Sequence, residues 1–473
     1  MRTALFINPP SGLYRRDDRC QCRVDDQTVS VIFEPIELAI YAAIFEREGC
    51  RCAIRDYPAM GSTWQDFERD IDALEPDVVL FVGTTATIEA DMQVPEIVKA
   101  LRPEALVIGK GETLGLWGKS ILEQHPELDA ILLGEPDLTL QELAQGRGLD
   151  EIEGTLRRDP ATGELTRRPR EDFLQDLDAL PMPARHLLMA DLYRSPETGR
   201  RMGVIHTQRG CPADCTFCNI GKVYGKKIRT RSPEHVCDEI EAAVRDFGIR
   251  EFLFHGDTFT YKRNWTIDVC REIVRRGLRV RWGCNSRVDS ICPERAEWMR
   301  RAGCWVVAFG VESGSQEILD SIKKGATLEQ AREAVRITKA AGMCAHVFMI
   351  IGTPEESRKT LEATEAFLRD LDPEFFDLNI AYPLPGTELY SKGQRTGLFD
   401  ERRLSYGSYA SAAIRSRYLS SQELTEWRRK TLLRLSLRPR YILRTLWRAR
   451  SPNRIRHYIR AGWARLRSLR SAA

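Results

Sequence analysis

Short apolar runs alternate with amphipathic segments along the first 145 residues. Five of these runs have the length of buried strands: 3–8, 52–56, 78–83, 105–109 and 130–134. Three segments between them carry apolar residues at helical spacing: 35–48, 88–101 and 113–123. A strand–helix–strand series predicts a doubly wound α/β sheet, whose ligands bind beyond the carboxyl ends of the strands.

A second alternating series occupies the middle of the chain. Its six predicted strands are 202–208, 251–256, 279–284, 304–310, 344–351 and 375–381, separated by helical segments such as 233–247 and 328–341. Six βα units predict a partial barrel, with functional residues at the carboxyl ends of its strands. We therefore expect four regions: a first domain at 1–148, a connector at 149–200 that contains a hairpin, a barrel at 201–395, and a helical region at 396–473.

The amino-acid composition adds one feature to this predicted fold, the number of cysteines. The 473 residues are 42% hydrophobic and 29% charged, which is ordinary for a globular protein, and no apolar run is long enough to span a bilayer. Thirteen cysteines without a signal peptide indicate a reducing compartment and metal or redox chemistry. The sequence therefore predicts a cytoplasmic protein.

Cys211, Cys215 and Cys218 follow the first barrel strand at CxxxCxxC spacing. Three thiolates can bind three irons of a [4Fe–4S] cubane, whereas a fully ligated electron-transfer cluster uses four cysteines. The fourth iron would be open to a small molecule. The alternatives are a zinc knuckle or three structural cysteines.

Polar groups recur where the later barrel strands end. His255-Gly256-Asp257 follows the second strand, and the ends of the next three strands carry similar groups: Asn285-Ser286-Arg287, Gly310 to Ser313, and Gly352 to Glu355. Strand ends of one barrel share one mouth. Each residue alone would suit a structural ion pair, but four groups in register with a three-cysteine loop favour a binding site.

The segment 201–390 resembles the radical S-adenosylmethionine (SAM) core domain, and within that superfamily the branch that carries an N-terminal cobalamin-binding domain. The matching landmarks in the barrel are Arg209–Pro212, Asp257–Thr260, Trp282–Asp289, Gly310–Gly314, Lys324-Gly325 and Pro383–Thr387. In the first domain and connector they are Asn8–Pro10, Gly134-Glu135 and Leu180–Arg185, so that the resemblance covers about residues 1–395. It implies a Rossmann-like cobalamin domain followed by a partial (β/α)6 barrel.

The resemblance implies a role for each matching residue. Cys211, Cys215 and Cys218 would ligate the cluster, and SAM would chelate the open iron through its amino and carboxylate groups. The implied SAM-binding residues are Phe217 beside the adenine, Asp257 at the amino group, Ser286, Arg287 at the carboxylate, Glu312 at the ribose, and Ile350 with Gly352 in the adenine motif. Phe348 stands where that motif has its first glycine.

For cobalamin, the small and polar residues at the first domain's strand ends are the candidates: Thr84, Thr85, Gly109, Gly111, Gly134 and Glu135. Related domains that place a histidine beneath the cobalt carry DxHxxG after the first strand. The corresponding loop here, Ser11 to Cys22, contains no histidine. We expect cobalamin to bind without a protein histidine ligand. Cys20, Cys22, Cys50 and Cys52 form two CxC pairs, which are too tightly spaced for a usual zinc site.

The resemblance implies an enzyme that reduces its cluster by one electron, cleaves SAM and forms a 5′-deoxyadenosyl radical. The first expectation is methylation of an unactivated carbon, with flavodoxin or ferredoxin as the reductant. The alternatives are cyclisation or rearrangement without net methylation, and RNA modification. A second cysteine triad, which RNA methylthiotransferases carry, is absent from residues 1–150.

The last 46 residues are strongly basic. Residues 428–473 carry fifteen Lys and Arg and no Asp or Glu, so the net charge of +3 leaves −12 on the rest of the chain. Arg440, Arg444 and Arg448 recur every fourth residue beside apolar positions, which predicts an amphipathic helix. Such a helix suits an anionic membrane surface and a lipid-like or tetrapyrrole substrate. RNA and the protein's own acidic body are the other candidate partners, and we rank nucleic acid last.

Overall fold

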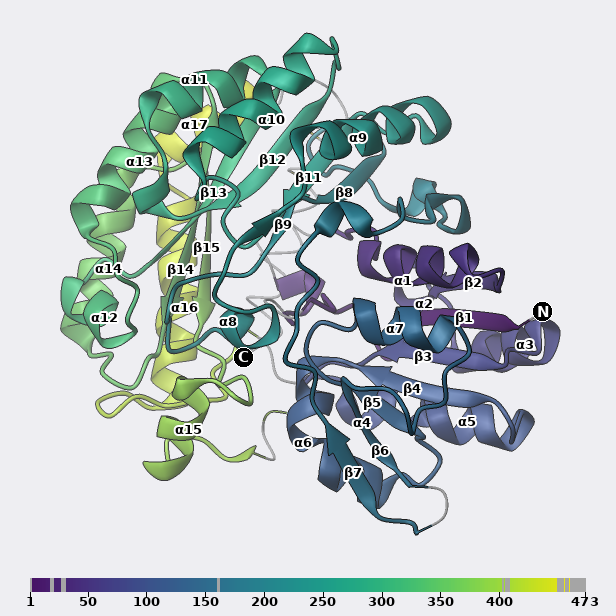
Figure 1. Ribbon diagram of the computed structural model, residues 1–473. Coiled ribbons are helices and arrows are strands. Elements are labelled where there is room, and N and C mark those ends of the chain that lie inside the picture. Colours follow the sequence, from purple (N-terminus) through teal and green to yellow (C-terminus); the bar gives the residue numbers. More distant parts are fainter. Residues whose placement is uncertain are drawn as a thin grey trace.

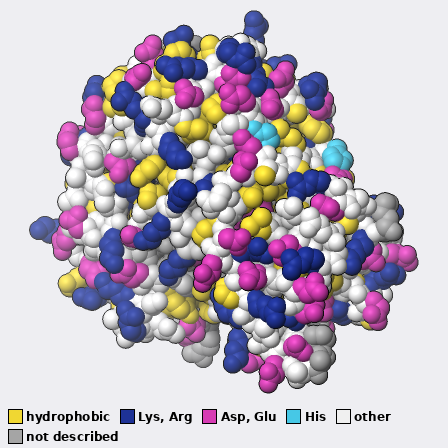
Figure 2. All heavy atoms as spheres, in the orientation of Figure 1, with side chains coloured by type: hydrophobic (Ala, Val, Ile, Leu, Met, Phe, Trp, Pro, Cys, Tyr) yellow, Lys and Arg dark blue, Asp and Glu magenta, His cyan; other side chains and the backbone are white. Residues whose placement is uncertain are grey.

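The computed structural model describes residues 2–17, 21–26, 31–159, 162–401, 404, 409–448, 455 and 459. Two α/β lobes lie side by side, with the N-terminal sheet on one side and the barrel on the other (Figure 1). The lobes confirm the α/β class and the order of a doubly wound sheet followed by a barrel. Over the face shown in Figure 2, acidic and basic side chains are interspersed.

The N-terminal sheet has seven strands in the order β2-β1-β3-β4-β5-β6-β7. Its parallel strands are β1 (Thr3–Asn8), β2 (Arg51–Asp56), β3 (Val78–Val82), β4 (Leu106–Lys110) and β5 (Ala130–Leu132). The order reverses between β1 and β3, and crevices at such switch points bind ligands in open α/β sheets.

Helices cover both faces of this sheet. They are α1 (Ile36–Arg47), α2 (Tyr57–Met60), α3 (Trp64–Leu74), α4 (Ile88–Asp91), α5 (Gln93–Leu101), α6 (Glu112–Gln124) and α7 (Asp137–Ala144). The α1 and α7 helices share one apolar core, while α3, α5 and α6 pack into the other. The single helix expected over 88–101 is two helices, α4 and α5.

The expected hairpin is present, and it belongs to the sheet. The antiparallel strands β6 (Thr155–Arg158) and β7 (Leu165–Arg168) continue from β5, so the sheet extends past residue 148. A strand at the sheet edge leaves N–H and C=O groups unpaired, and the hairpin satisfies those of β5. The boundary at 148 remains a prediction.

Six parallel strands form the barrel, in the order β15-β14-β13-β12-β11-β8. They are β8 (Met202–His206), β11 (Glu251–His255), β12 (Arg281–Ser286), β13 (Cys304–Glu312), β14 (Cys344–Ile351) and β15 (Phe375–Ile380). A short antiparallel pair, β9 (Gln208–Arg209) and β10 (Arg229–Thr230), flanks the cysteine loop, which contains α8 (Ile220–Val223).

The barrel is open on the side that the N-terminal lobe covers, and helices cover its outside (Figure 1). These helices are α9 (Pro233–Phe247), α10 (Arg263–Arg275), α11 (Pro293–Arg301), α12 (Gln316–Ser321), α13 (Leu328–Ala340) and α14 (Arg358–Leu371). Several begin as their sequences direct: Ser232 caps α9 with Pro233 at its first turn, and Thr327 begins α13 with a capping box.

Buried ion pairs join the two lobes. The Arg185 Nη2 atom lies 3.1 Å from Glu34 Oε1 and 2.7 Å from Glu239 Oε1. Glu34 Oε1 also accepts a hydrogen bond from the Val204 N–H of β8 at 2.7 Å. Arg185 ends the Leu180–Arg185 segment of the connector, so this segment holds the sheet and barrel together.

In the described part of the chain, three helices follow the last barrel strand, and the second and third lie in the region 396–473 that is expected to be helical. These helices are α15 (Glu388–Arg395), α16 (Ser421–Ser436) and α17 (Pro439–Arg448). Leu424, Trp427, Leu432 and Leu435 of α16 belong to the barrel core. Most of the basic tail beyond 448 lies outside the described residues. Among the described helices, none has the length and apolarity needed to cross a bilayer.

Candidate functional site

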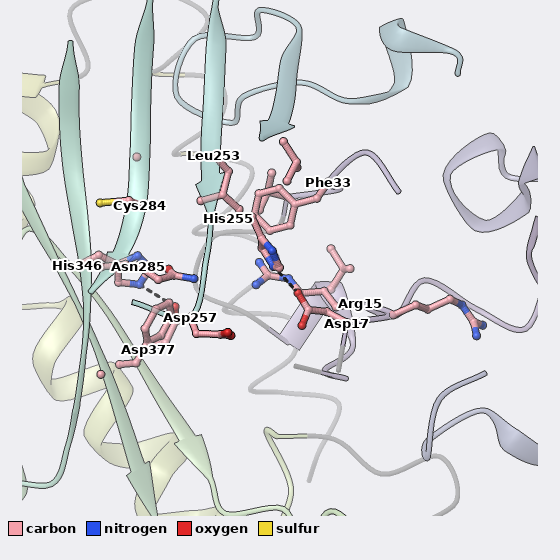
Figure 3. Close-up of a pocket in the computed structure, with 18 of the residues that line it drawn as sticks. Arg15, Asp17, Phe33, Leu253, His255, Asp257, Cys284, Asn285, His346 and Asp377 are labelled. Carbon is pink, nitrogen blue, oxygen red and sulfur yellow. Dashed lines mark hydrogen bonds and ion pairs between the residues drawn. The ribbon is translucent and has the colours of Figure 1, made fainter. Parts of the chain in front are cut away.

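A cavity of about 560 Å³ lies between the barrel and the N-terminal lobe. One wall consists of inward-facing residues of the six barrel strands, and the other of residues in the loop after β1 (Figure 3). Cys211, Cys215 and Cys218 all line it. The barrel strands, the cysteine loop and the loop after β1 therefore all contribute side chains to one cavity.

The backbone around the cysteine loop is held from three sides. The Cys211 N–H donates to the Gly225 carbonyl at 3.1 Å, and the Thr216 N–H donates to the Ile322 carbonyl at 3.0 Å. The Thr216 carbonyl accepts from the Leu389 N–H of α15 at 2.8 Å. The Cys218 N–H donates to the Cys215 carbonyl at 3.1 Å, which closes a turn between the two cysteines. A loop tied in this way presents its thiols in a fixed arrangement.

The three thiols can each bind a different iron of a cubane cluster. Within the described residues, no three His, Cys, Asp or Glu side chains are close enough together to hold one metal ion. A cubane binds each thiolate through a different iron, so its cysteines stand further apart than the ligands of one zinc ion. Burial raises the pKa of the Cys211 and Cys215 thiols, and iron binding would displace their protons.

Asp257 and Arg287 line the cavity at the ends of β11 and β12, as the sequence predicts. The Arg287 Nη2 atom lies 2.8 Å from Asp289 Oδ2 and donates to the Lys324 carbonyl at 2.9 Å. These contacts fix the plane of the guanidinium. Nη1 makes no hydrogen bond to another described residue, so one edge can reach a ligand carboxylate.

Glu312 ends β13 beside Lys324, whose Nζ lies 2.7 Å from Glu312 Oε1. Both side chains are buried and line the cavity. Burial alone lowers the pKa of Lys324, but the nearby Glu312 carboxylate raises it above its ordinary value. Glu312 has a φ of 71°, at an irregularity in the β13–β14 register. Strained backbone of this kind is concentrated at functional sites.

The remaining SAM candidates divide into two groups. Phe217 and Ile350 line the cavity and pack against the same small apolar cluster, which suits a stacked adenine. Ser286 also lines it, with its hydroxyl bonded to that of Thr260. Gly352 is outside the lining residues: its φ is 81°, and a Cβ there would lie 3.1 Å from Leu424 Cδ1. Its visible role is to let α16 approach β14.

The six cobalamin candidates are not among the residues that line the cavity. The Thr85 N–H donates to Gln21 Oε1 at 2.8 Å, and a Cβ on Gly111 would overlap the Gly83 carbonyl. Thr84 and Gly109 are buried, and the Gly134 backbone has a φ of 64° in a turn.

Glu135 has a structural partner in the other lobe. Its two carboxylate oxygens lie 2.8 and 2.7 Å from the Nη1 and Nη2 atoms of Arg229. The neighbouring Asp137 pairs with Arg209 in the same way. Arg209 and Arg229 are the two arginines of the β9–β10 pair, so these carboxylates clamp the cysteine loop to the N-terminal lobe.

The cavity meets the N-terminal sheet at its switch point instead. Asn8 ends β1, Asp56 ends β2 and Val82 ends β3, and all three line the cavity. Arg16 lies over this edge, donating to the Val82 carbonyl at 2.6 Å and pairing with Asp91 at 3.1 Å. The place expected for a large planar ligand is therefore present, and the loop after β1 borders it.

Several cavity residues escaped the sequence interpretation. His206 and His346 lie within strands, where a histidine is more often structural than a ligand, and the sequence indicates Asn285 only as part of a polar strand end. All three line the cavity. Asp17 of the loop after β1 reaches His255, with Asp17 Oδ2 2.7 Å from Nε2 (Figure 3). The alternation of strand side chains could have found them, because His255 and Asn285 precede Asp257 and Arg287 by two positions.

Among the described residues, the CxC cysteines belong to no group of three side chains that could hold a metal ion. Cys22 is buried, and burial raises the pKa of Cys52 to about 12. The Cys52 thiol donates to the Ala42 carbonyl at 3.5 Å. Cys20 lies outside the described residues.

Residues 205–368 match the Radical SAM superfamily. An uncharacterized methyltransferase of Pyrococcus horikoshii is 31% identical over 417 residues, which cover 87% of this chain and 90% of the relative. The anaerobic magnesium-protoporphyrin IX monomethyl ester cyclase of Rubrivivax gelatinosus is 28% identical over 71% of this chain and 62% of that protein.

Among solved structures, the cobalamin-dependent SAM radical enzyme OxsB, with aqua-cobalamin and SAM bound, has the same fold. The TM-score is 0.73 at 16% identity, covering 99% of this chain and 72% of OxsB. The likeness therefore includes both lobes and their arrangement.

Proposed function

This chain belongs to the radical SAM superfamily, in its methyltransferase-like branch, and on that premise we propose a cobalamin-dependent enzyme that methylates an unactivated carbon of a hydrophobic substrate. The observation that carries the proposal is the shared cavity. Three cysteines at CxxxCxxC spacing and the polar ends of β11, β12 and β13 all face it. When bound, the cluster supplies the electron that cleaves SAM, and cobalamin supplies methyl-transfer chemistry.

In this proposal, the protein's residues bind and orient SAM. Cys211, Cys215 and Cys218 hold the cluster. Arg287 directs its remaining edge to the SAM carboxylate, and Asp257 accepts from the amino group. The Glu312 carboxylate, paired with Lys324, accepts from a ribose hydroxyl. Phe217 and Ile350 enclose the adenine and exclude water.

Cobalamin is assigned to the crevice between β1 and β3, where Asn8, Asp56 and Val82 face the cavity. OxsB, of the same fold, has aqua-cobalamin bound, which supports the assignment. No histidine is available from residues 11–22 to ligate cobalt. The six strand-end residues predicted from the sequence would serve as supports of this crevice and not as its lining.

The substrate assignment rests on the cavity walls. Apolar side chains of the loop after β1 face the barrel: Leu13, Val24, Val31, Ile32 and Phe33. The Rubrivivax gelatinosus relative is named for a tetrapyrrole ester, which agrees with a hydrophobic substrate. It also supports the alternative of cyclisation without net methylation. Retention of one SAM-derived methyl group in the product for each turnover would favour methylation.

The test begins with anaerobic reconstitution of the full chain with iron, sulfide and hydroxocobalamin. We expect about four irons per chain, one cobalt, and formation of 5′-deoxyadenosine from SAM with a one-electron reductant. Cys218→Ala should lose the cluster and SAM cleavage. The matched control is Cys292→Ala, at a partly exposed position before α11. Equal iron content and SAM cleavage in the two variants would disprove the assignment of the cluster.

We further propose that α17 binds a membrane surface, which would place this enzyme at the inner face of the cytoplasmic membrane. Arg444 and Arg448 face the protein's own acidic groups, with Arg444 Nη1 2.8 Å from Asp372 Oδ2. The exposed stripe of this helix is apolar, with Leu443, Leu446 and Trp447 each 60–68% exposed. An apolar stripe flanked by arginines suits the lipid headgroup region.

Flotation with phosphatidylcholine vesicles, with and without phosphatidylserine, tests this contact. The full chain should float with the anionic vesicles, and Leu443→Ser with Trp447→Ser should remove most of that binding. Tyr418→Ser is the control, because Tyr418 is equally exposed elsewhere. Unchanged flotation of the double variant would leave α17 without this role.

A further inference from the structure

A ring of polar side chains crosses the inside of the barrel at one level. The strand registers pair His206 with His255, and Asn285 and His346 with Ala308 from either side. Phe254 pairs with Cys284, which places His255 beside Asn285. All of these ring positions line the cavity.

His346 is oriented by a buried carboxylate. Its Nε2 atom lies 2.9 Å from Asp377 Oδ2, and its ring centroid is 4.5 Å from that of Phe348. A carboxylate only accepts hydrogen bonds, so Nε2 carries a proton on this edge, and Nδ1 is the ring nitrogen that can accept a hydrogen bond from a ligand. Nδ1 makes no hydrogen bond within the described chain.

Asn285 lies beside His346, and both point into the cavity (Figure 3). Its side-chain amide makes no hydrogen bond with any residue that the structure describes. A polar group facing a mostly apolar cavity costs free energy unless it finds a partner. Together the two residues offer one acceptor nitrogen and one amide, which match a group that both donates and accepts.

The second histidine makes an anionic ligand unfavourable here. His255 stacks on His206 with ring centroids 4.6 Å apart, and its Nε2 atom pairs with Asp17. His255 and His346 are thus each already paired with a carboxylate. A phosphate or carboxylate would face Asp17 and Asp377, whereas a neutral hydroxyl or N–H group would not be repelled.

The ring lies one layer below the SAM-binding level. His255 and Asn285 precede Asp257 and Arg287 by two residues, a rise of about 7 Å along a strand. Apolar side chains border the space around it, among them Leu253 and Phe33 (Figure 3). A substrate group bound at the ring would therefore fix a carbon atom between the two layers.

We propose that His346, held by Asp377, and Asn285 recognise a neutral hydroxyl or N–H group on an otherwise apolar substrate. The group donates to His346 Nδ1, and where it is a hydroxyl its oxygen also accepts from the Asn285 side-chain N–H. This inference rests on the proposed function, since it defines the substrate of the same cavity. It makes His346 and Asn285 specificity residues and leaves SAM cleavage to the cysteine loop.

Two matched probe pairs test it on the anaerobically reconstituted full chain: indole with 1-methylindole, and farnesol with farnesyl methyl ether. Dissociation constants come from ligand-detected NMR titrations. The N–H or O–H member of each pair should bind about tenfold more tightly, the ratio expected for one good hydrogen bond, because methylation removes only the donor.

His346→Phe should reduce this ratio to near one in both pairs, because it removes the acceptor of the donated hydrogen bond. Asn285→Leu should weaken the binding of farnesol several-fold and leave that of indole unchanged. Asn379→Leu is the matched control, because Asn379 faces the same cavity two positions beyond Asp377 and should retain the preference. Equal binding within each pair by the wild-type protein, a preference that survives His346→Phe, or no binding of any probe would overturn the proposal.

Iron content and 5′-deoxyadenosine formation are measured on the same samples. The His346 and Asn285 variants should keep both, since neither side chain hydrogen-bonds to a described residue of the cysteine loop. Loss of the probe preference with iron and SAM cleavage intact is the expected pattern. A wild-type chain without iron or SAM cleavage would contradict the proposed function alone, because probe preference is scored separately.

Discussion

Glu356 is a fully buried carboxyl group between β14 and α14, and its replacement by glutamine is expected to stabilise the protein at alkaline pH. One oxygen accepts from the Gly352 N–H at 3.2 Å, and the other contacts the Thr360 hydroxyl. That hydroxyl also lies 2.9 Å from the Ser357 carbonyl. It can donate to this carbonyl while accepting from a protonated Glu356 or from a glutamine amide. Glutamine therefore reproduces the hydrogen bonds of the neutral acid.

Burial raises the pKa of Glu356 from 4.5 to about 7. Because the folded state holds the proton more tightly than the unfolded state, this contribution to stability is complete below pH 4.5 and is lost as the pH rises through 7. At about 1.4 kcal/mol for each pH unit, ionisation of Glu356 costs about 3 kcal/mol above pH 7. Glu356→Gln removes that cost, so its advantage over the wild type should grow with pH.

Urea unfolding followed by tryptophan fluorescence at pH 5.0, 7.0 and 8.5 measures this difference. We expect the variant to exceed the wild type by up to about 3 kcal/mol at pH 8.5 and to differ by less than about 1 kcal/mol at pH 5.0. Glu333→Gln is the control, since Arg336 bonds to this exposed carboxyl and lowers its pKa, which leaves it ionised across the range. A pH-independent difference for Glu356→Gln, or a variant weaker than wild type at pH 8.5, would refute the reasoning.

Three further predictions concern how the lobes, the strand ends and the tail are held. Arg229→Ala leaves a buried carboxylate without its partner and should lower the free energy of unfolding by about 3–5 kcal/mol; Arg336→Ala, at an exposed pair, should leave the urea midpoint unchanged. At Gly111 the backbone has a φ of 146°, and a Cβ would overlap the Gly83 carbonyl, so Gly111→Ala should lower the free energy of unfolding by about 1–3 kcal/mol. Gly49→Ala is the control and should cost less stability, because its Cβ would meet no atom within 4 Å. Arg444→Ala removes a contact that holds α17 and should make chymotrypsin cleave the tail several-fold faster; an unchanged rate would show that other contacts suffice.

The hydrophobic periodicity of the sequence was sufficient to predict the α/β architecture of the two lobes. The helix expected at 233–247 and the strand at 344–351 have those bounds in the structure. This success has a physical basis, because buried parallel strands need nearly continuous apolar runs and the covering helices need apolar faces. The predicted cluster ligands are equally local, because Cys211, Cys215 and Cys218 lie within one loop.

Which of the candidate cobalamin-binding residues line the cavity could not be predicted from their spacing in the sequence. Thr84 and Gly109 follow predicted strands, as the rule for strand ends requires, but the ligand crevice lies where strand order reverses. That order, β2-β1-β3-β4-β5, is a property of the assembled sheet. It moves the cavity edge to Asn8, Asp56 and Val82. Glu135, also at a strand end, is instead neutralised by Arg229 from the other lobe.

The tail and the histidines show the same division. Its arginine spacing predicted an amphipathic helix, but whether Arg444 meets lipid, RNA or protein depends on Asp372, which is 72 residues away. His346 and Asp377 lie on separate strands, and only their register makes them a pair. The sequence alone determined the elements, their order and the cysteine loop, because these follow from local spacing. The tertiary structure decided which side chains face the cavity and which neutralise each other, because those contacts join residues that are remote along the chain.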